Sequence, residues 1–180
     1  MVVLVPLVAA AAVLIGTAGL AKLRSPLATA QALSTAGVPH RYVLVRLLGG
    51  VELAVAVGVL ATGAPGFLAA LGICYAGFAG FLSYVLMRGI RLESCGCAGS
   101  REIPPTRFHV VLNAAAAAAA LAAVATAPPS AASVVVDLGL SAVTFVLGTL
   151  AFSYLLYVAA VFLPTVVAHP HGVASLSPPA

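Results

Sequence analysis

Five apolar stretches, each long enough for a helix to cross a lipid bilayer, limit the fold of this sequence more than any other feature. A helix spans a bilayer core with about 20 apolar residues. The stretches cover about residues 2–20, 43–61, 66–87, 108–127 and 134–163. In hydrocarbon, backbone donors and acceptors must be paired within a helix or a closed barrel. The stretches lack the two-residue alternation of barrel strands, so they predict transmembrane helices.

The composition excludes a water-soluble protein of this size. Of 180 residues, 63% are hydrophobic and 7% are charged, whereas soluble domains have about 25% charged residues. We predict an all-α, polytopic membrane bundle over residues 1–164 and a disordered tail over 165–180. The first stretch is expected to stay as a membrane helix, because nothing basic precedes it as in a signal peptide. The fifth is longer than a bilayer requires, so it must tilt, kink or protrude.

The basic residues are confined to two of the connections between the apolar stretches. All eight lie in or beside the first and third connections: Lys22, Arg24, Arg41, Arg46, Arg88, Arg91, Arg101 and Arg107. Basic residues accumulate on the cytoplasmic side of a membrane. The pattern therefore predicts a multi-pass plasma-membrane protein with its N-terminus outside and its C-terminus in the cytoplasm. It also accounts for the net charge of +4 without nucleic-acid binding.

Two further segments suggest how the helices pack. Ser25-Pro26 and Gly37, followed by Pro39, are typical of a helix start and stop. They predict a short helix at the membrane surface with an apolar side formed by Leu27, Ala30 and Leu33. In the fourth stretch, residues 114–120 are all alanine. Small side chains let helices approach closely in lipid, so this run predicts a packing surface.

Glu52 lies about nine residues into the second apolar stretch. A carboxylate at membrane depth is costly, so it is expected to be paired or functional. Gly49 and Ala56, one turn away on either side, leave room for another helix. Arg46 lies on a different helical face, whereas Lys22 has a stem long enough to reach inward. We interpret Glu52 and Lys22 as a structural pair; a proton-carrying or substrate-binding carboxylate is the alternative.

Cys95-Gly96-Cys97 in the third connection is the motif most suggestive of chemistry. Two cysteines separated by one residue can close a small disulfide ring, and glycine supplies the backbone freedom that this ring requires. Strain makes such a bond easy to reduce. Arg91 and Arg101 nearby favour thiolate formation. The motif therefore suits thiol–disulfide exchange.

Two other interpretations of the cysteine pair remain open: half of a metal site, with His109 as the nearest further ligand, and an incidental reduced pair. Cys74, in the middle of the third stretch, is interpreted as a structural apolar side chain. No metal site is predicted. No phosphate-binding glycine loop or haem-bracketing histidine pair is present; a quinone fits sterically between membrane helices, but no residue pattern indicates one.

The Gly-Thr-Ala-Gly-Leu-Ala-Lys run ending at Lys22, the lone Glu52 and the Cys-Gly-Cys-Ala-Gly element together resemble the methylamine-utilisation protein MauE family. This family belongs to the wider DoxX-like group of small membrane proteins. The resemblance covers about residues 8–124 and implies a four-helix core, with a fifth helix added here. It also implies a role in maturing the disulfides of a partner, alongside a thioredoxin-like protein. In the methylamine pathway that partner is the small subunit of methylamine dehydrogenase; this substrate is not carried over.

The expected function is therefore thiol–disulfide exchange through Cys95 and Cys97, with the chain acting as a component of a thiol–disulfide oxidoreductase. The contrasting hypothesis is a non-redox transporter or assembly scaffold in which Glu52 is the key residue. The charge pattern places the cysteines on the cytoplasmic side, whereas disulfide formation normally belongs outside the cytoplasm. A relay of reducing equivalents from the cytoplasm reconciles the two, and a reversed topology is the alternative.

Overall fold

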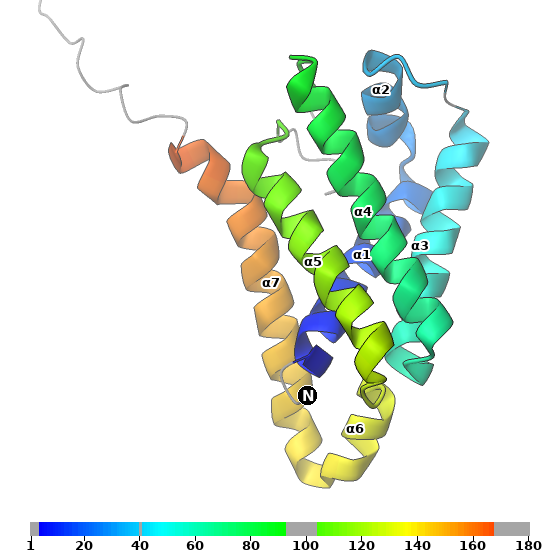
Figure 1. Cartoon of the computed structure of the whole chain (residues 1–180), viewed down its shortest axis with the longest axis vertical. Helices are drawn as coiled ribbons and strands as arrows, with labels where there is room; N and C mark the ends of the chain where they lie inside the picture. Colours follow the sequence, from blue (N-terminus) through cyan, green and yellow to red (C-terminus); the bar gives the residue numbers. More distant parts are fainter. Residues whose placement is uncertain (1–3, 40, 93–103, 168–180) are drawn as a thin grey trace, which may run out of the picture.

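The computed structural model describes residues 4–39, 41–92 and 104–167, which form helices joined by short connections (Figure 1). Its elements are α1 (Leu4–Arg24), α2 (Leu27–Thr35), α3 (Tyr42–Thr62), α4 (Pro65–Met87), α5 (Arg107–Thr126), α6 (Ala131–Leu138), the 3-10 turn η1 (Gly139–Ser141) and α7 (Ala142–Val167). Within the described residues, five helical segments are long and apolar enough to cross a membrane. The all-α membrane bundle predicted from the sequence is confirmed.

The bundle is built from two closely packed helix pairs, α1 with α3 and α4 with α5, and α7 packs against α1 (Figure 1). The side chains at the centre are mostly small or branched: Val8, Ala12, Ile15, Val55, Val59, Leu68, Leu71, Ala117, Ala120 and Ala123. The three buried alanines of α5 recur every third residue and so share one face. The packing surface predicted for the alanine run is therefore present, although it uses one side of the run.

The fifth predicted span is divided by a break in its helix. Gly139 has a φ of +53°, a left-handed value that suits glycine, and the chain makes a 3-10 turn before α7 begins. Helix α6 thus forms a short corner at the end of α5, and α7 returns along the bundle (Figure 1). α7 continues to Val167, past Pro164, where we expected the helix to end. Residues 168–180 lie outside the described residues.

The short helix of the first connection is present as α2, and its buried side agrees with the prediction in part. Ala30 is buried as predicted and Leu33 is half-buried, whereas Leu27 is 50% exposed, and Ala32 and Ala36 are buried in addition. Ala32 and Ala36 pack against the end of α4 rather than lying on a lipid surface. The stop signal is confirmed: Gly37 has a φ of +72°, and its N–H donates to the Ser34 carbonyl.

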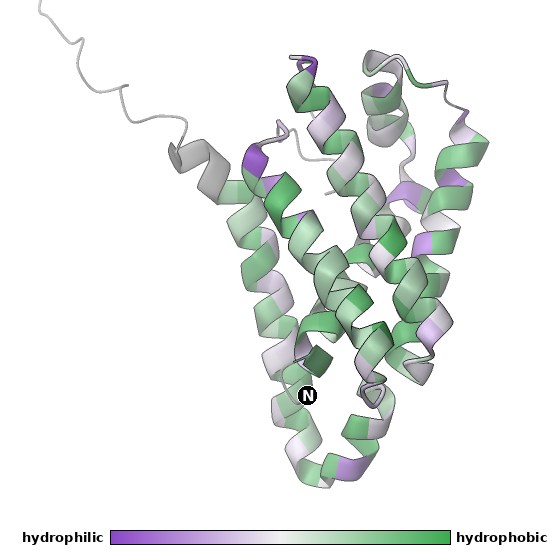
Figure 2. Ribbon diagram, viewed as in Figure 1, coloured by the Kyte–Doolittle hydropathy of each residue, from purple (hydrophilic) through white to green (hydrophobic). Residues whose placement is uncertain are grey.

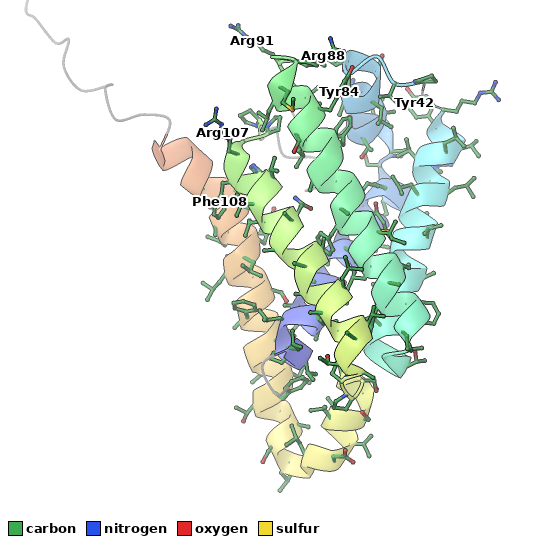
Figure 3. All side chains as sticks on the ribbon, viewed as in Figure 1. Tyr42, Tyr84, Arg88, Arg91, Arg107 and Phe108 are labelled. Atoms are coloured by element: carbon green, nitrogen blue, oxygen red, sulfur yellow. The ribbon has the colours of Figure 1, made fainter. Side chains whose placement is uncertain are left out.

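Strongly hydrophilic residues lie at the end of the bundle where α4 ends and α5 begins, and Asp137 of α6 lies at the opposite end (Figure 2). Arg88, Arg91 and Arg107 are exposed there (Figure 3). Exposed Tyr42 and Tyr84 lie at the same end, as is typical of an aromatic belt at a membrane boundary. Helices α3, α4 and α7 also expose large apolar side chains: Val43 and Leu47 on α3, Ile73 on α4, and Leu147 and Leu155 on α7. These surfaces suit contact with lipid tails.

Candidate functional site: a buried ion pair beside an apolar cavity

Two glycines bring the backbones of α1 and α3 into contact. A Cβ atom added at Gly19 would lie 2.6 Å from the Gly49 carbonyl oxygen, and one added at Gly49 would lie 2.7 Å from the Gly19 carbonyl oxygen. Real Cβ atoms do not approach backbone oxygen so closely, so any larger residue would force the helices apart. The reciprocal contact explains why both positions are glycine and why the two helices pack so closely.

One helical turn beyond these glycines, Lys22 and Glu52 form a buried ion pair. The Lys22 Nζ donates a hydrogen bond to the Glu52 Oε2 over 2.9 Å, and the two side chains are 3% and 0% exposed. Residues three apart share a helix face, so Gly19 and Gly49 set the distance at which the pair forms. The pairing of Glu52 with Lys22 that the sequence predicted is present. Arg46, also singled out in α3, is exposed and lies outside the pair.

The surroundings of the pair are apolar and leave one of its oxygens without a partner. The Lys22 Nζ lies 5.3 Å from the centre of the Phe78 ring, within the range of a cation–π interaction. The Glu52 Oε1 is fully buried and has no hydrogen-bond partner among the described residues. A buried acceptor of this kind destabilises the fold unless it binds a proton or a donor. Lys22 therefore holds one oxygen of Glu52, while the other oxygen has no hydrogen-bond donor among the described residues.

Lys22 also lines a cavity of about 440 Å³ between α1, α4, α5 and α7. Most of its lining is apolar, and alanines of α1 and α5 make the space. Aromatic side chains enter from two helices, Tyr75 and Phe78 from α4 and Phe152 and Tyr157 from α7. Tyr75 and Phe78 pack edge to face with ring centres 6.3 Å apart. Small-molecule sites typically combine such an apolar lining with a few polar groups.

His109 and Asn113 of α5 add polar groups to the cavity lining. The Thr106 backbone N–H donates to the His109 Nδ1 over 3.2 Å, and the Thr106 Oγ1 lies 2.8 Å from the same nitrogen. A ring nitrogen that accepts from a backbone N–H carries no proton, so the proton of the neutral ring is on Nε2. The ring also interacts with the Ala160 backbone of α7. His109 therefore caps α5 and links it to α7.

The sequence did not indicate this role for His109, which we considered only as a metal ligand for the cysteine pair. The described residues contain no group of three or more His, Cys, Asp or Glu side chains that could hold a metal ion. The signal that could have identified the cap is the three-residue spacing from Thr106 to His109 directly after Pro104-Pro105. A second signal was Asn113, whose amide stands in a largely apolar helix and donates a hydrogen bond to the His109 carbonyl.

The model of the family described as methylamine utilisation protein MauE matches residues 1–126. The chain belongs to the MauE family. The match begins before α1 and ends at the last residue of α5, Thr126. It therefore agrees with the resemblance recognised over about residues 8–124. No curated protein and no solved structure matches the chain significantly.

Within the MauE region lie both the ion pair and the cysteine motif, whereas α6, η1 and α7 lie beyond it. Cys95, Gly96 and Cys97 fall outside the described residues. The described structure stops at Leu92, after α4, and resumes at Pro104, before α5. Cys74, in α4, is a half-buried free thiol packed against the core, in keeping with the structural role expected of it.

Proposed function

We propose that this MauE-family protein takes part in thiol–disulfide exchange through Cys95 and Cys97, supporting the maturation of a partner protein. The observation that carries the proposal is a Cys-Gly-Cys motif inside the family-matched region, in a connection whose described flanks bear Arg88, Arg91 and Arg107. Positive charge stabilises thiolate, the reactive form of cysteine. A motif of this kind at the basic end of a membrane bundle suits exchange with a soluble partner.

In the proposed reaction, a thiolate of a thioredoxin-like partner attacks the Cys95–Cys97 disulfide and forms a mixed disulfide. The second partner thiol then resolves it, leaving the partner oxidised and Cys95 and Cys97 reduced. Two electrons and two protons move from the partner dithiol to the Cys95–Cys97 pair. The charge pattern favours the cytoplasmic side of the plasma membrane for this end of the protein, with the N-terminus outside.

The test is mass-shift alkylation of the purified full-length chain across a graded thiol–disulfide buffer. We expect one two-electron transition that Cys74→Ser leaves unchanged and that Cys95→Ser or Cys97→Ser abolishes. If Cys95 and Cys97 stay reduced in oxidising buffer, or link only between chains, the redox proposal is wrong. A membrane-impermeant maleimide applied to intact cells reports the side of the membrane on which the two thiols lie.

A non-redox transporter or assembly scaffold centred on Glu52 is the competing function. Its support is the Glu52 Oε1, buried without a partner in the described structure. Against it, the other oxygen is paired with Lys22 at 2.9 Å, which suits a structural role. Loss of partner maturation in Cys95→Ser, with normal protein abundance, favours the redox function. Loss in Glu52→Gln alone, at normal abundance, favours the scaffold or transporter.

A further inference from the structure

The cavity that Lys22 lines is completed by a helix from outside the family match. Its lining comes from α1, α4 and α5 of the matched region and from α7 beyond it. Helix α7 packs mainly against α1 and touches α5 little, so the space remains between α5 and α7. The cavity is partly open, and Leu7 and Phe152 in its lining are exposed. In a bilayer, the molecules that reach such an opening are lipids.

Most polar side chains of the lining already hydrogen-bond within the protein. Lys22 donates to Glu52, and the Tyr75 hydroxyl donates to a backbone carbonyl of α1 over 2.8 Å. The His109 ring bonds to the backbone at the start of α5 and to the backbone of α7. The Asn113 amide donates to a backbone carbonyl of its own helix over 2.7 Å. A cavity with so few free polar groups suits a hydrocarbon better than water or a polar ligand.

The size of the cavity fits one hydrocarbon chain. Its volume of about 440 Å³ is about three times that of an apolar cavity of about 150 Å³ that binds benzene. The lining runs from position 7 to 22 on α1, from 109 to 119 on α5 and from 152 to 161 on α7. At the helical rise, these stretches are about 14 to 22 Å long. One leaflet of the bilayer core is about 15 Å deep, so the cavity is about as long as a leaflet is deep.

The end of the cavity at Lys22 and His109 lies beside two exposed arginines. Arg24 follows Lys22 by two residues at the end of α1, and Arg107 precedes His109 by two residues at the start of α5 (Figure 3). Neither arginine forms an ion pair with another described residue. Guanidinium groups bind phosphate through paired, charge-assisted hydrogen bonds. Cationic groups above an apolar chain site match the two parts of a phospholipid.

We propose that the cavity holds one acyl chain of an anionic phospholipid whose phosphate lies at Arg24 and Arg107. A lipid of net negative charge is favoured over a zwitterionic one, because neither arginine has a carboxylate partner in the described structure. The chain fills the space between α5 and α7 and so attaches α7 to the region that the MauE model matches. The site goes beyond the proposed function, since it uses neither Cys95 nor Cys97.

The test is photolabelling of the full-length protein in mild detergent by phosphatidylglycerol with a diazirine at the end of one acyl chain, with the labelled peptides mapped by mass spectrometry. We expect saturable labelling of α1, α5 and α7 that unlabelled phosphatidylglycerol competes away. Ala119→Leu should weaken binding about tenfold by filling the cavity. Ala118→Leu, at an exposed position of the same helix outside the lining, should leave binding unchanged. Ala116→Leu is a second lining variant, for use if Ala119→Leu lowers protein yield.

A pair of arginine variants tests the headgroup end of the site. Arg24→Gln with Arg107→Gln should weaken phosphatidylglycerol binding at least about tenfold, because each basic residue near the surface contributes about a factor of five. Arg41→Gln with Arg46→Gln removes the same charge from exposed positions around the start of α3 and should have a much smaller effect. Equal effects of the two pairs, or equal binding of phosphatidylcholine, would overturn the headgroup assignment. Labelling that does not saturate, spreads over the exposed faces of α3 and α4 and survives Ala119→Leu would overturn the site itself.

Discussion

Removing one partner of the Lys22–Glu52 pair should destabilise the protein far more than removing both. Glu52 lies ten positions after Tyr42, the first residue of α3, so it is about 15 Å along the helix, half of the bilayer core. An unpaired charge at that depth costs about 3 kcal/mol on insertion scales. Glu52→Gln and Lys22→Met should each cost about this much. Additivity then predicts about 6 kcal/mol for the double variant, whereas we expect about 1–2 kcal/mol, since no charge remains buried.

The assay is equilibrium unfolding of the purified full-length variants in mixed micelles with increasing SDS, followed by far-ultraviolet circular dichroism. Arg46→Met is the matched control, because it removes a charge from an exposed position of the same helix. It should change the free energy of unfolding by less than about 0.5 kcal/mol. A double variant that equals the sum of the singles within about 0.5 kcal/mol would refute an energetic pair, whatever its geometry.

The same unfolding assay tests three further side chains. Gly19→Ala should lower the free energy of unfolding by about 2 kcal/mol or more, because the new Cβ would meet the Gly49 carbonyl oxygen at 2.6 Å. The control Gly50→Ala, whose Cβ would have no atom within 4 Å, should be neutral or slightly stabilising. Equal effects of the two variants would contradict the close contact. Tyr75→Phe should cost about 1 kcal/mol by removing a hydroxyl that donates to an α1 carbonyl over 2.8 Å; an unchanged midpoint would show that the bond contributes nothing. Thr149→Val should be neutral or stabilising, because the buried hydroxyl oxygen has no partner among the described residues; a clear loss of stability would reveal an unseen partner.

The positions of the spans could be predicted from the sequence because apolar length alone determines them. The second predicted span, 43–61, differs from α3 (Tyr42–Thr62) by one residue at each end. The ion pair could be predicted for a similar reason: in lipid, a buried carboxylate needs a partner, and Lys22 was the basic residue in reach. Small neighbours at Gly49 and Ala56 indicated which face would be covered.

What depends on tertiary contacts could not be predicted in the same way. The buried side of α2 is set by the end of α4, so Leu27 faces outward although it is the more apolar residue. The break at Gly139 lies within the apolar fifth stretch, two residues after Asp137. One aspartate and one glycine at that point do not distinguish a kink from a straight, tilted helix. The cavity is formed by four helices together, and no single helix shows it in its own pattern.

The contact between Gly19 and Gly49 also bears on how the chain enters the membrane during synthesis. Helix α3 carries Glu52 at its centre, so on leaving the translocon alone it would present a bare carboxylate to lipid. Helix α1 is made first, and Lys22 stands near its end. Because the two glycines allow direct backbone contact, α1 can pack against α3 as soon as α3 leaves the translocon, provided that α1 has stayed near the exit site. Membrane insertion of α3 is thereby coupled to retention of α1, and the order of synthesis becomes part of the folding pathway.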